Sequence, residues 1–153
     1  MRTLSQDFLE TLLAQAREAP RGRVNYNLHE PHELVQRMIN VVTPGSYITP
    51  HKHENPDKIE IIAPLIGRVA AFHFGEDGRV RETFVLDAGT GERLLDIPPR
   101  TYHTFFALTP AVILEVIQGP YDAATHKKFA PWAPLEGDAS CAAYMAELLA
   151  LVR

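Results

Sequence analysis

The chain has 153 residues, of which 46% are hydrophobic and 22% are charged, and its formal net charge is −4. This length predicts a single domain with a buried core, and the acidic balance argues against a nucleic-acid partner. There is no run of eighteen apolar residues and no apolar leader, so we expect neither a membrane span nor secretion. Cys141 is the single cysteine and cannot form an internal disulfide, which is typical of a cytoplasmic protein.

Helical patterns occur at both ends of the chain. From Ser5 to Arg17 the apolar residues recur at helical spacing, which predicts an amphipathic helix within residues 1–20. A second helix is expected from Asp138 to Leu151, within residues 138–153, with Asp138 as its N-cap. We expect its apolar side to consist of Met145, Leu148, Leu149 and Val152.

Residues 34–118 carry β-strand signals and form the predicted barrel core. Short apolar runs separated by turn residues predict strands at Leu34–Val42, Tyr47–Thr49, Ile59–Ile62, Val69–Phe74, Arg79–Leu86, Arg93–Ile97, Thr101–Ala107 and Val112–Ile117. The Asp-Gly pair at 77–78 predicts a hairpin. This spacing of strands and turns is typical of an all-β sandwich or barrel. Residues 119–137 are rich in proline and aromatic residues, which predicts an irregular strap packed on the barrel.

Four residues point to a metal site. His51 and His53 end a strand-like run, and residues two apart on a strand face the same side. Glu60 lies among isoleucines, where an unpaired carboxylate is costly to bury, and His103 follows a proline turn. Three imidazoles and a carboxylate suit one divalent transition metal, namely Fe, Mn, Ni, Cu or Zn. Sequence does not choose among these metals.

Three further residues are candidates for binding a substrate. Arg37 lies in an otherwise apolar strand, where it either holds an anionic substrate group or pairs with Glu115 on a neighbouring strand. Tyr47 either supplies a phenol at the mouth of the pocket or packs in the core. We expect His29 and His126, which lie in polar segments, to be solvated.

These residues resemble the two motifs of the cupin superfamily. The first motif has the pattern Gly-x5-His-x-His, a gap, then Glu-x6-Gly, and it matches Gly45, His51, His53, Glu60 and Gly67. The second motif, Pro-x-Gly-x-x-His, matches residues 98–103, with Arg100 in place of the glycine and Ala107 in place of the later asparagine. The resemblance implies a double-stranded β-helix, or jelly-roll barrel, with His51, His53, Glu60 and His103 as metal ligands. It also implies a homodimer, because cupins often pair through their sheets.

A narrower resemblance is to the WbuC-type cupin-fold metalloproteins, a bacterial family. It is carried by residues 35–38, 50–58, 103–108 and 115–134, and its most specific part is Phe129-Ala-Pro-Trp-Ala-Pro134. That family is often associated with surface-polysaccharide gene clusters. The resemblance therefore implies a small-molecule ligand from polysaccharide biosynthesis, such as a saccharide intermediate.

Three functional classes remain open. The first is a metal-dependent small-molecule enzyme of oxygenase or isomerase type. The second is a non-catalytic sensor that uses the same barrel to hold a ligand, since fold alone does not decide function. The third is a metal-free sugar-nucleotide isomerase or epimerase. Retention of all four ligand positions disfavours the third class.

Overall fold

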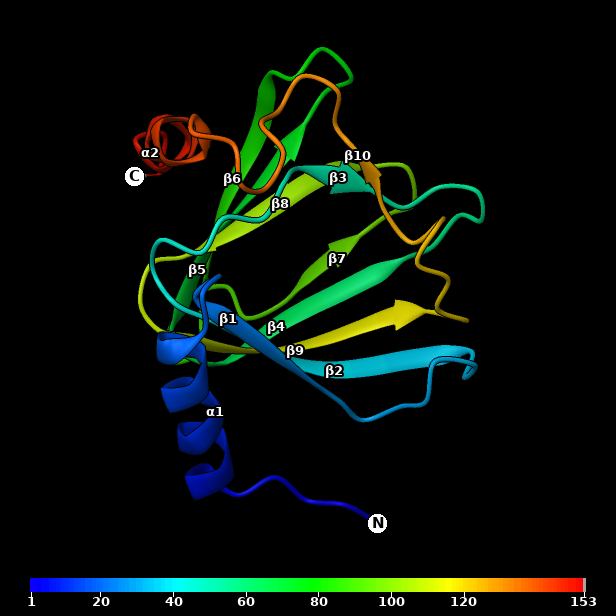
Figure 1. Cartoon of the computed structure of the whole chain (residues 1–153), viewed down its shortest axis with the longest axis vertical. Helices are drawn as coiled ribbons and strands as arrows, with labels where there is room; N and C mark the ends of the chain where they lie inside the picture. The colour runs from blue at the N-terminus through cyan, green and yellow to red at the C-terminus, as the bar shows by residue number, and fades with distance from the viewer. Residues whose placement is uncertain (153) are drawn as a thin grey trace.

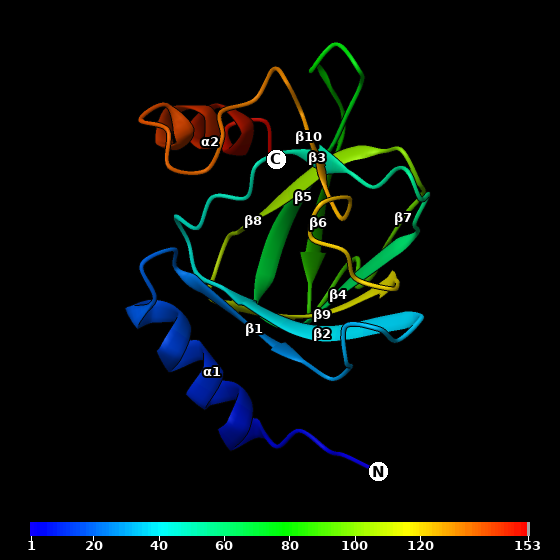
Figure 2. The same cartoon turned by 45° about the vertical axis from the view of Figure 1, so that its right-hand side comes forward.

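Two antiparallel five-stranded sheets face each other in the computed structural model, which describes residues 1–152 (Figures 1 and 2). Sheet A has the order β1 (Arg23–Asn27), β2 (Val35–Val42), β9 (Ala111–Gln118), β4 (Glu60–Ile66), β7 (Leu95–Ile97). Sheet B has the order β10 (Lys128–Phe129), β3 (His51–Lys52), β8 (Tyr102–Ala107), β5 (Arg68–Phe74), β6 (Val80–Asp87). Within the described residues, no helix is long and apolar enough to cross a membrane.

The N-terminal helix α1 (Gln6–Glu18) covers the outer face of sheet A (Figure 2). The Ser5 hydroxyl caps it by accepting a hydrogen bond from the backbone N–H of Phe8, and the helix ends just before Pro20. Its buried stripe packs on the outward side chains of β2 and β9 in one cluster: Leu9, Leu12, Leu13, Ala16, Ile39, Val41 and Val112. The predicted N-terminal helix is confirmed.

The C-terminal helix α2 (Cys141–Leu149) lies outside sheet B, and Leu148 is buried against that sheet. The predicted start at Asp138 is wrong. The Asp138 carboxylate accepts a hydrogen bond from the backbone N–H of Leu135 instead, which closes a turn before the helix, and Ser140 is the N-cap residue. The expected range 138–153 ends at Arg153, which lies outside the described residues.

The space between the sheets is apolar at one end only. There, inward side chains of both sheets form a buried cluster: Val42, Ile62, Val69, Ala71, Leu86, Ile97, Phe105, Ala107, Ala111 and Ile113. This packing closes the barrel at that end, where burial of apolar surface stabilises the contact between the sheets. The other end is hollow.

Three strand predictions need correction. Residues 47–49 are not a strand, because the regular pairing begins only at His51, after Pro50, which has no N–H to donate. The strands β1 and β10 were not predicted, and both lie outside residues 34–118. β10 belongs to the segment predicted as a strap and pairs Phe129 with His51 of β3, so this segment contacts sheet B there.

Gly67 forms the tight connection between β4 and β5, and substitution at this position tests how closely the chain packs there. It has a positive φ of 75°, and an added Cβ would lie 2.2 Å from the carbonyl oxygen of Pro110. Gly45 also has a positive φ, of 92°, but a Cβ there would meet nothing within 4 Å. Both alanine variants carry a backbone cost of about 1–2 kcal/mol. We expect the free energy of unfolding, measured in urea, to fall by about 1–3 kcal/mol more for Gly67→Ala than for Gly45→Ala. Equal losses would contradict the close approach.

Candidate metal centre

The fold brings the four predicted ligands together at the hollow end of the barrel. His51 on β3 lies directly opposite His103 on β8, His53 follows β3, and Glu60 begins β4 on the facing sheet. All four side chains are buried, and one ligand atom from each lies within 4.8 Å of the others. The cluster therefore joins the two sheets.

Backbone carbonyl groups orient all three imidazoles in the same way. The Nδ1 atoms of His51 and His103 each lie 2.9 Å from the carbonyl oxygen two residues earlier, those of Thr49 and Thr101. The Nδ1 atom of His53 contacts the carbonyl oxygen of His126. A carbonyl oxygen only accepts hydrogen bonds, so each Nδ1 carries the proton. Each Nε2 lone pair is thereby available to the centre of the cluster, as in metal-bound histidines.

The centre of the cluster requires a positive charge. The Glu60 Oε2 atom lies 2.8 Å from His53 Nε2 and 3.2 Å from His103 Nε2. With Nδ1 protonated, these contacts place lone pairs against a carboxylate, which is repulsive unless an added proton or a cation lies between them. Among the described residues, His103 Nε2 is buried and has no hydrogen-bond partner. The donor set therefore fits a divalent metal ion.

The pKa values in the cluster follow from burial and neighbouring charge. Burial, and then the positive charge of Lys127, hold the pKa of His51 well below its ordinary value. Burial by itself raises the pKa of Glu60, but the adjacent His103 and His53 outweigh it and hold that pKa well below its ordinary value. At neutral pH the cluster thus contains a neutral His51 imidazole and an ionised Glu60, which are the forms that bind metal.

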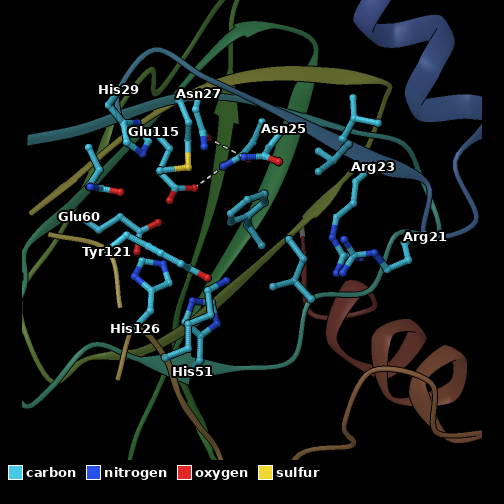
Figure 3. Close-up of a pocket in the computed structure, with 18 of the residues that line it drawn as sticks. Arg21, Arg23, Asn25, Asn27, His29, His51, Glu60, Glu115, Tyr121 and His126 are labelled. Carbon is cyan, nitrogen blue, oxygen red and sulfur yellow. Dashed lines mark hydrogen bonds between the residues drawn. The ribbon is translucent and has the colours of Figure 1, made fainter. Parts of the chain in front are cut away.

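A cavity of about 780 Å³ extends from the cluster between the sheets (Figure 3). Its wall on sheet A is largely polar, because Met38 and Val42 are joined there by six polar residues of β1, β2 and β9: Arg23, Asn25, Asn27, Gln36, Asn40 and Glu115. Alternate residues of these strands face outward and pack against α1. At the hollow end, sheet A therefore has apolar residues on its outer face and mostly polar residues on its inner face, which places hydrogen-bonding groups inside a cavity.

Glu115 is the predicted candidate that lines this cavity. Its carboxyl group is buried and accepts a hydrogen bond from the side-chain amide of Asn40. Burial, and then the negative charge of Glu60, raise the pKa of Glu115 to about 8, with Lys127 and Asn40 acting in the opposite direction. Glu115 is consequently a neutral carboxylic acid at pH 7.

Arg37 and Tyr47 do not line the cavity. Arg37 lies on the outward face of β2, where its guanidinium donates to Glu33 at 2.6 Å and to the carbonyl of Leu28, so it does not pair with Glu115. Tyr47 packs on Phe106 and Tyr144, and its hydroxyl donates to the carbonyl of Pro134. Of the two alternatives for Tyr47, the structure shows packing in the core, and the chain before Pro50 is not a strand that would turn Tyr47 to the side of His51.

Two histidines expected in solvent are not solvated. His29 is buried, and its Nδ1 contacts the backbone of Arg37. His126 is partly buried and lines the cavity beside His53, with ring centroids 5.1 Å apart, and burial is the main cause that lowers the pKa of His126 to about 4. Sequence gave no signal for either position, because the loops that carry them are polar.

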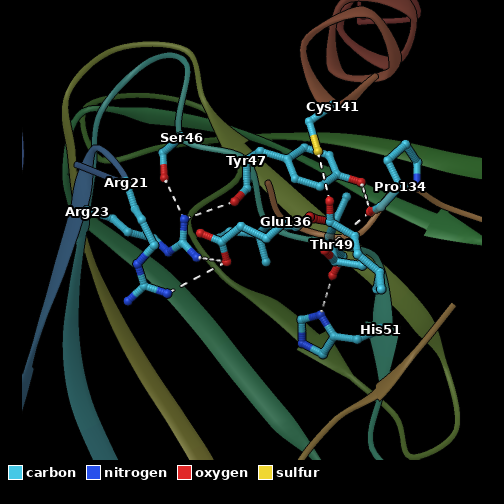
Figure 4. Close-up of polar contacts among 12 residues, drawn as sticks. Arg21, Arg23, Ser46, Tyr47, Thr49, His51, Pro134, Glu136 and Cys141 are labelled. Carbon is cyan, nitrogen blue, oxygen red and sulfur yellow. Dashed lines mark hydrogen bonds and ion pairs between the residues drawn. The ribbon is translucent and has the colours of Figure 1, made fainter. Parts of the chain in front are cut away.

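An ion pair joins sheet A to the strap beside the cavity (Figure 4). The guanidinium of Arg23 contacts the carboxylate of Glu136 at 2.6 Å and donates to the carbonyl of Tyr47 at 2.9 Å. Arg21 contacts the same carboxylate at 3.7 Å. Neither arginine was singled out from the sequence.

The fold is shared with solved cupin structures. The chain is similar to an oxalate oxidase in complex with glycolate (TM-score 0.54, 19% identity, 74% of this chain and 57% of that chain). It is also similar to the capsular polysaccharide assembling protein CapF from Staphylococcus aureus (TM-score 0.61, 17% identity, 72% and 32%). A third similar structure is KdgF from Halomonas sp. (TM-score 0.53, 20% identity, 69% and 84%). The chain thus spans 57% of the oxalate oxidase and 32% of CapF. The predicted cupin β-barrel with terminal helices is confirmed.

The chain belongs to the family described as Domain of unknown function (DUF6016), whose pattern matches residues 4–86, more than half of the chain. The match includes α1, His51, His53 and Glu60, and it ends before His103. No curated protein sequence matches the chain.

The raised pKa of Glu115 predicts a pH-dependent stability. Between pH 4.5 and 8, folded Glu115 holds a proton that the unfolded chain releases, so its contribution to stability falls as pH rises through this range. Glu115→Gln does not titrate. In chelator-treated protein, we expect its free energy of unfolding, relative to the parent, to improve steadily from pH 5 to 8 and then to level off.

The matched control is Glu147→Gln on the exposed side of α2, which should show a difference from the parent that does not change with pH. A pH-independent difference for Glu115→Gln as well would contradict a neutral, buried Glu115.

Proposed function

We propose that this protein is a divalent-metal-binding cupin that binds or acts on a small molecule in its barrel. His51, His53, Glu60 and His103 would hold the metal. The observation that carries the proposal is the buried cluster of three imidazoles and one carboxylate, with ligand atoms within 4.8 Å of one another and every Nδ1 held by a backbone carbonyl. Such outer contacts hold imidazole ligands in metal centres.

A bound divalent metal would act as a Lewis acid toward an oxygen atom of the ligand. The chain's own residues would bind and orient that ligand. The amide groups of Asn25, Asn27 and Asn40 offer neutral hydrogen bonds, and Glu115 offers a protonated carboxyl group within the same cavity. Phe105 and Ile48 supply apolar surface beside them.

We further propose that the ligand is a saccharide intermediate of bacterial surface-polysaccharide metabolism and that the protein is a cytoplasmic member of the WbuC type. The support is the resemblance carried by residues 115–134, the amide-rich wall, and the similarity in fold to a protein described as assembling capsular polysaccharide. Amide side chains both donate and accept hydrogen bonds, as sugar hydroxyl groups do.

Metal content tests the proposal directly. We expect about one equivalent of a transition metal per chain in protein purified without chelator, by elemental analysis. A His51→Ala/His103→Ala variant should lose it, because two of the four ligands are removed. Near-zero metal in the parent, even after reconstitution with Fe(II), Mn(II), Ni(II) and Zn(II), would overturn the proposal.

His73→Ala is the matched control for this experiment. His73 lies beside His103 on the neighbouring strand β5, but its Nδ1 contacts Glu82 and it is outside the cluster. This variant should retain the full metal content. Circular dichroism of all variants shows whether a loss of metal reflects a loss of fold.

A further inference from the structure

The outer end of the cavity is cationic, although the chain as a whole carries a net charge of −4. Arg21, Arg23 and Lys127 line the main cavity and also a smaller adjoining one of about 410 Å³. These three residues therefore lie where the two cavities adjoin. Figure 3 shows Arg21 and Arg23 across the cavity from Glu60 and Glu115.

The local charges at this end do not cancel. Glu136 is the carboxylate that contacts the two arginines, so it compensates one of their two charges. Among residues 1–152, no carboxylate lies within ion-pair distance of Lys127, whereas the next residue, Lys128, pairs with Glu54. The two other cavity carboxyl groups lie elsewhere, Glu60 among the histidines and Glu115 against Asn40.

Lys127 is positioned by the same segment that completes the metal cluster. The carbonyl oxygen of the preceding residue, His126, accepts the hydrogen bond from His53 Nδ1, and the His126 ring packs 4.9 Å from that of Tyr121. Two residues further on, β10 pairs with β3. The backbone on both sides of Lys127 is thus anchored to the site, and its side chain lines the cavity.

We propose that Lys127, with Arg21 and Arg23, forms a subsite for the anionic group, a carboxylate or a phosphate, of a small molecule that occupies the cavity. This assignment rests on the proposed function, because the subsite is the outer end of the cavity that leads to the metal ligands. Arg23 is held by Glu136 and by the carbonyl of Tyr47, so it is pre-oriented rather than free. Lys127 supplies the uncompensated charge, and the neutral amide wall does not repel an anion.

Three small molecules of similar size separate the possibilities: glycerate, glycerol 3-phosphate and glycerol. Binding is measured by isothermal titration calorimetry to metal-loaded and to chelator-treated protein. We expect at least one of the two anions to bind both forms and glycerol to bind neither detectably. Affinity should fall as ionic strength rises. Whichever anion binds more tightly identifies the anionic group as carboxylate or phosphate.

Lys127→Gln should weaken binding of the preferred anion at least about fivefold, because a charge-assisted hydrogen bond is lost. Lys128→Gln is the matched control, since its side chain pairs with Glu54 away from the cavity, and it should change affinity less than about twofold. Melting temperatures confirm that both variants are folded.

Equal binding of glycerol and the anions, no anion binding, or an unchanged affinity in Lys127→Gln would each overturn the subsite. The result of the anion-binding experiment can be distinguished from the result of the metal-content experiment. Anion binding by a protein that takes up no metal would leave the subsite standing and remove the proposed function. One equivalent of metal without anion binding would do the reverse.

Discussion

Three backbone carbonyl oxygens determine what this site can be. By accepting the Nδ1 protons of His51, His53 and His103, they leave three Nε2 lone pairs in a cluster with one buried carboxylate, that of Glu60. Two of those carbonyl groups, of Thr49 and Thr101, lie just before the strands that carry His51 and His103, and the third, of His126, comes from the strap. The site is therefore complete only when the strap is in place. Because backbone carbonyl groups fix the protonated nitrogen of each imidazole, the backbone also sets the need for a positive charge at the centre of the cluster.

The four cluster residues could be predicted from sequence because they follow short-range rules. The spacing of His51 and His53 fixes a shared direction, and Glu60 and His103 stand out because each is polar in an apolar strand. Arg37 is also a polar residue in an apolar strand, but it does not line the cavity as predicted. Apolar residues occur on both faces of β2, with Ile39 and Val41 packed under α1, so the pattern did not show that Arg37 lies on the outer face, where it pairs with Glu33.

The polar wall of the cavity was not predicted from the sequence, for a related reason. Strand alternation shows which residues share a face, but it does not show which face is inside. In β1, Val24 and Tyr26 pack under α1 while Arg23, Asn25 and Asn27 line the cavity, which reverses the usual assignment of apolar residues to the interior. The packing of α1 on one face of β1 decides this, and strand alternation does not show on which face that helix lies.

The inverted polarity of sheet A and the charge of the cavity mouth have one physical consequence. A fold stabilised only by burial would place apolar residues in the hollow end of the barrel, as it does at the opposite end around Ile113 and Phe105. Instead the hollow end holds amides, a neutral carboxylic acid and three cations, groups whose desolvation costs energy unless a partner satisfies them. A divalent ion at the histidines would add further positive charge beside them. Among residues 1–152, the carboxylates at this end are too few to balance that charge, and this imbalance is the reason for proposing an anionic group on the molecule that enters the cavity.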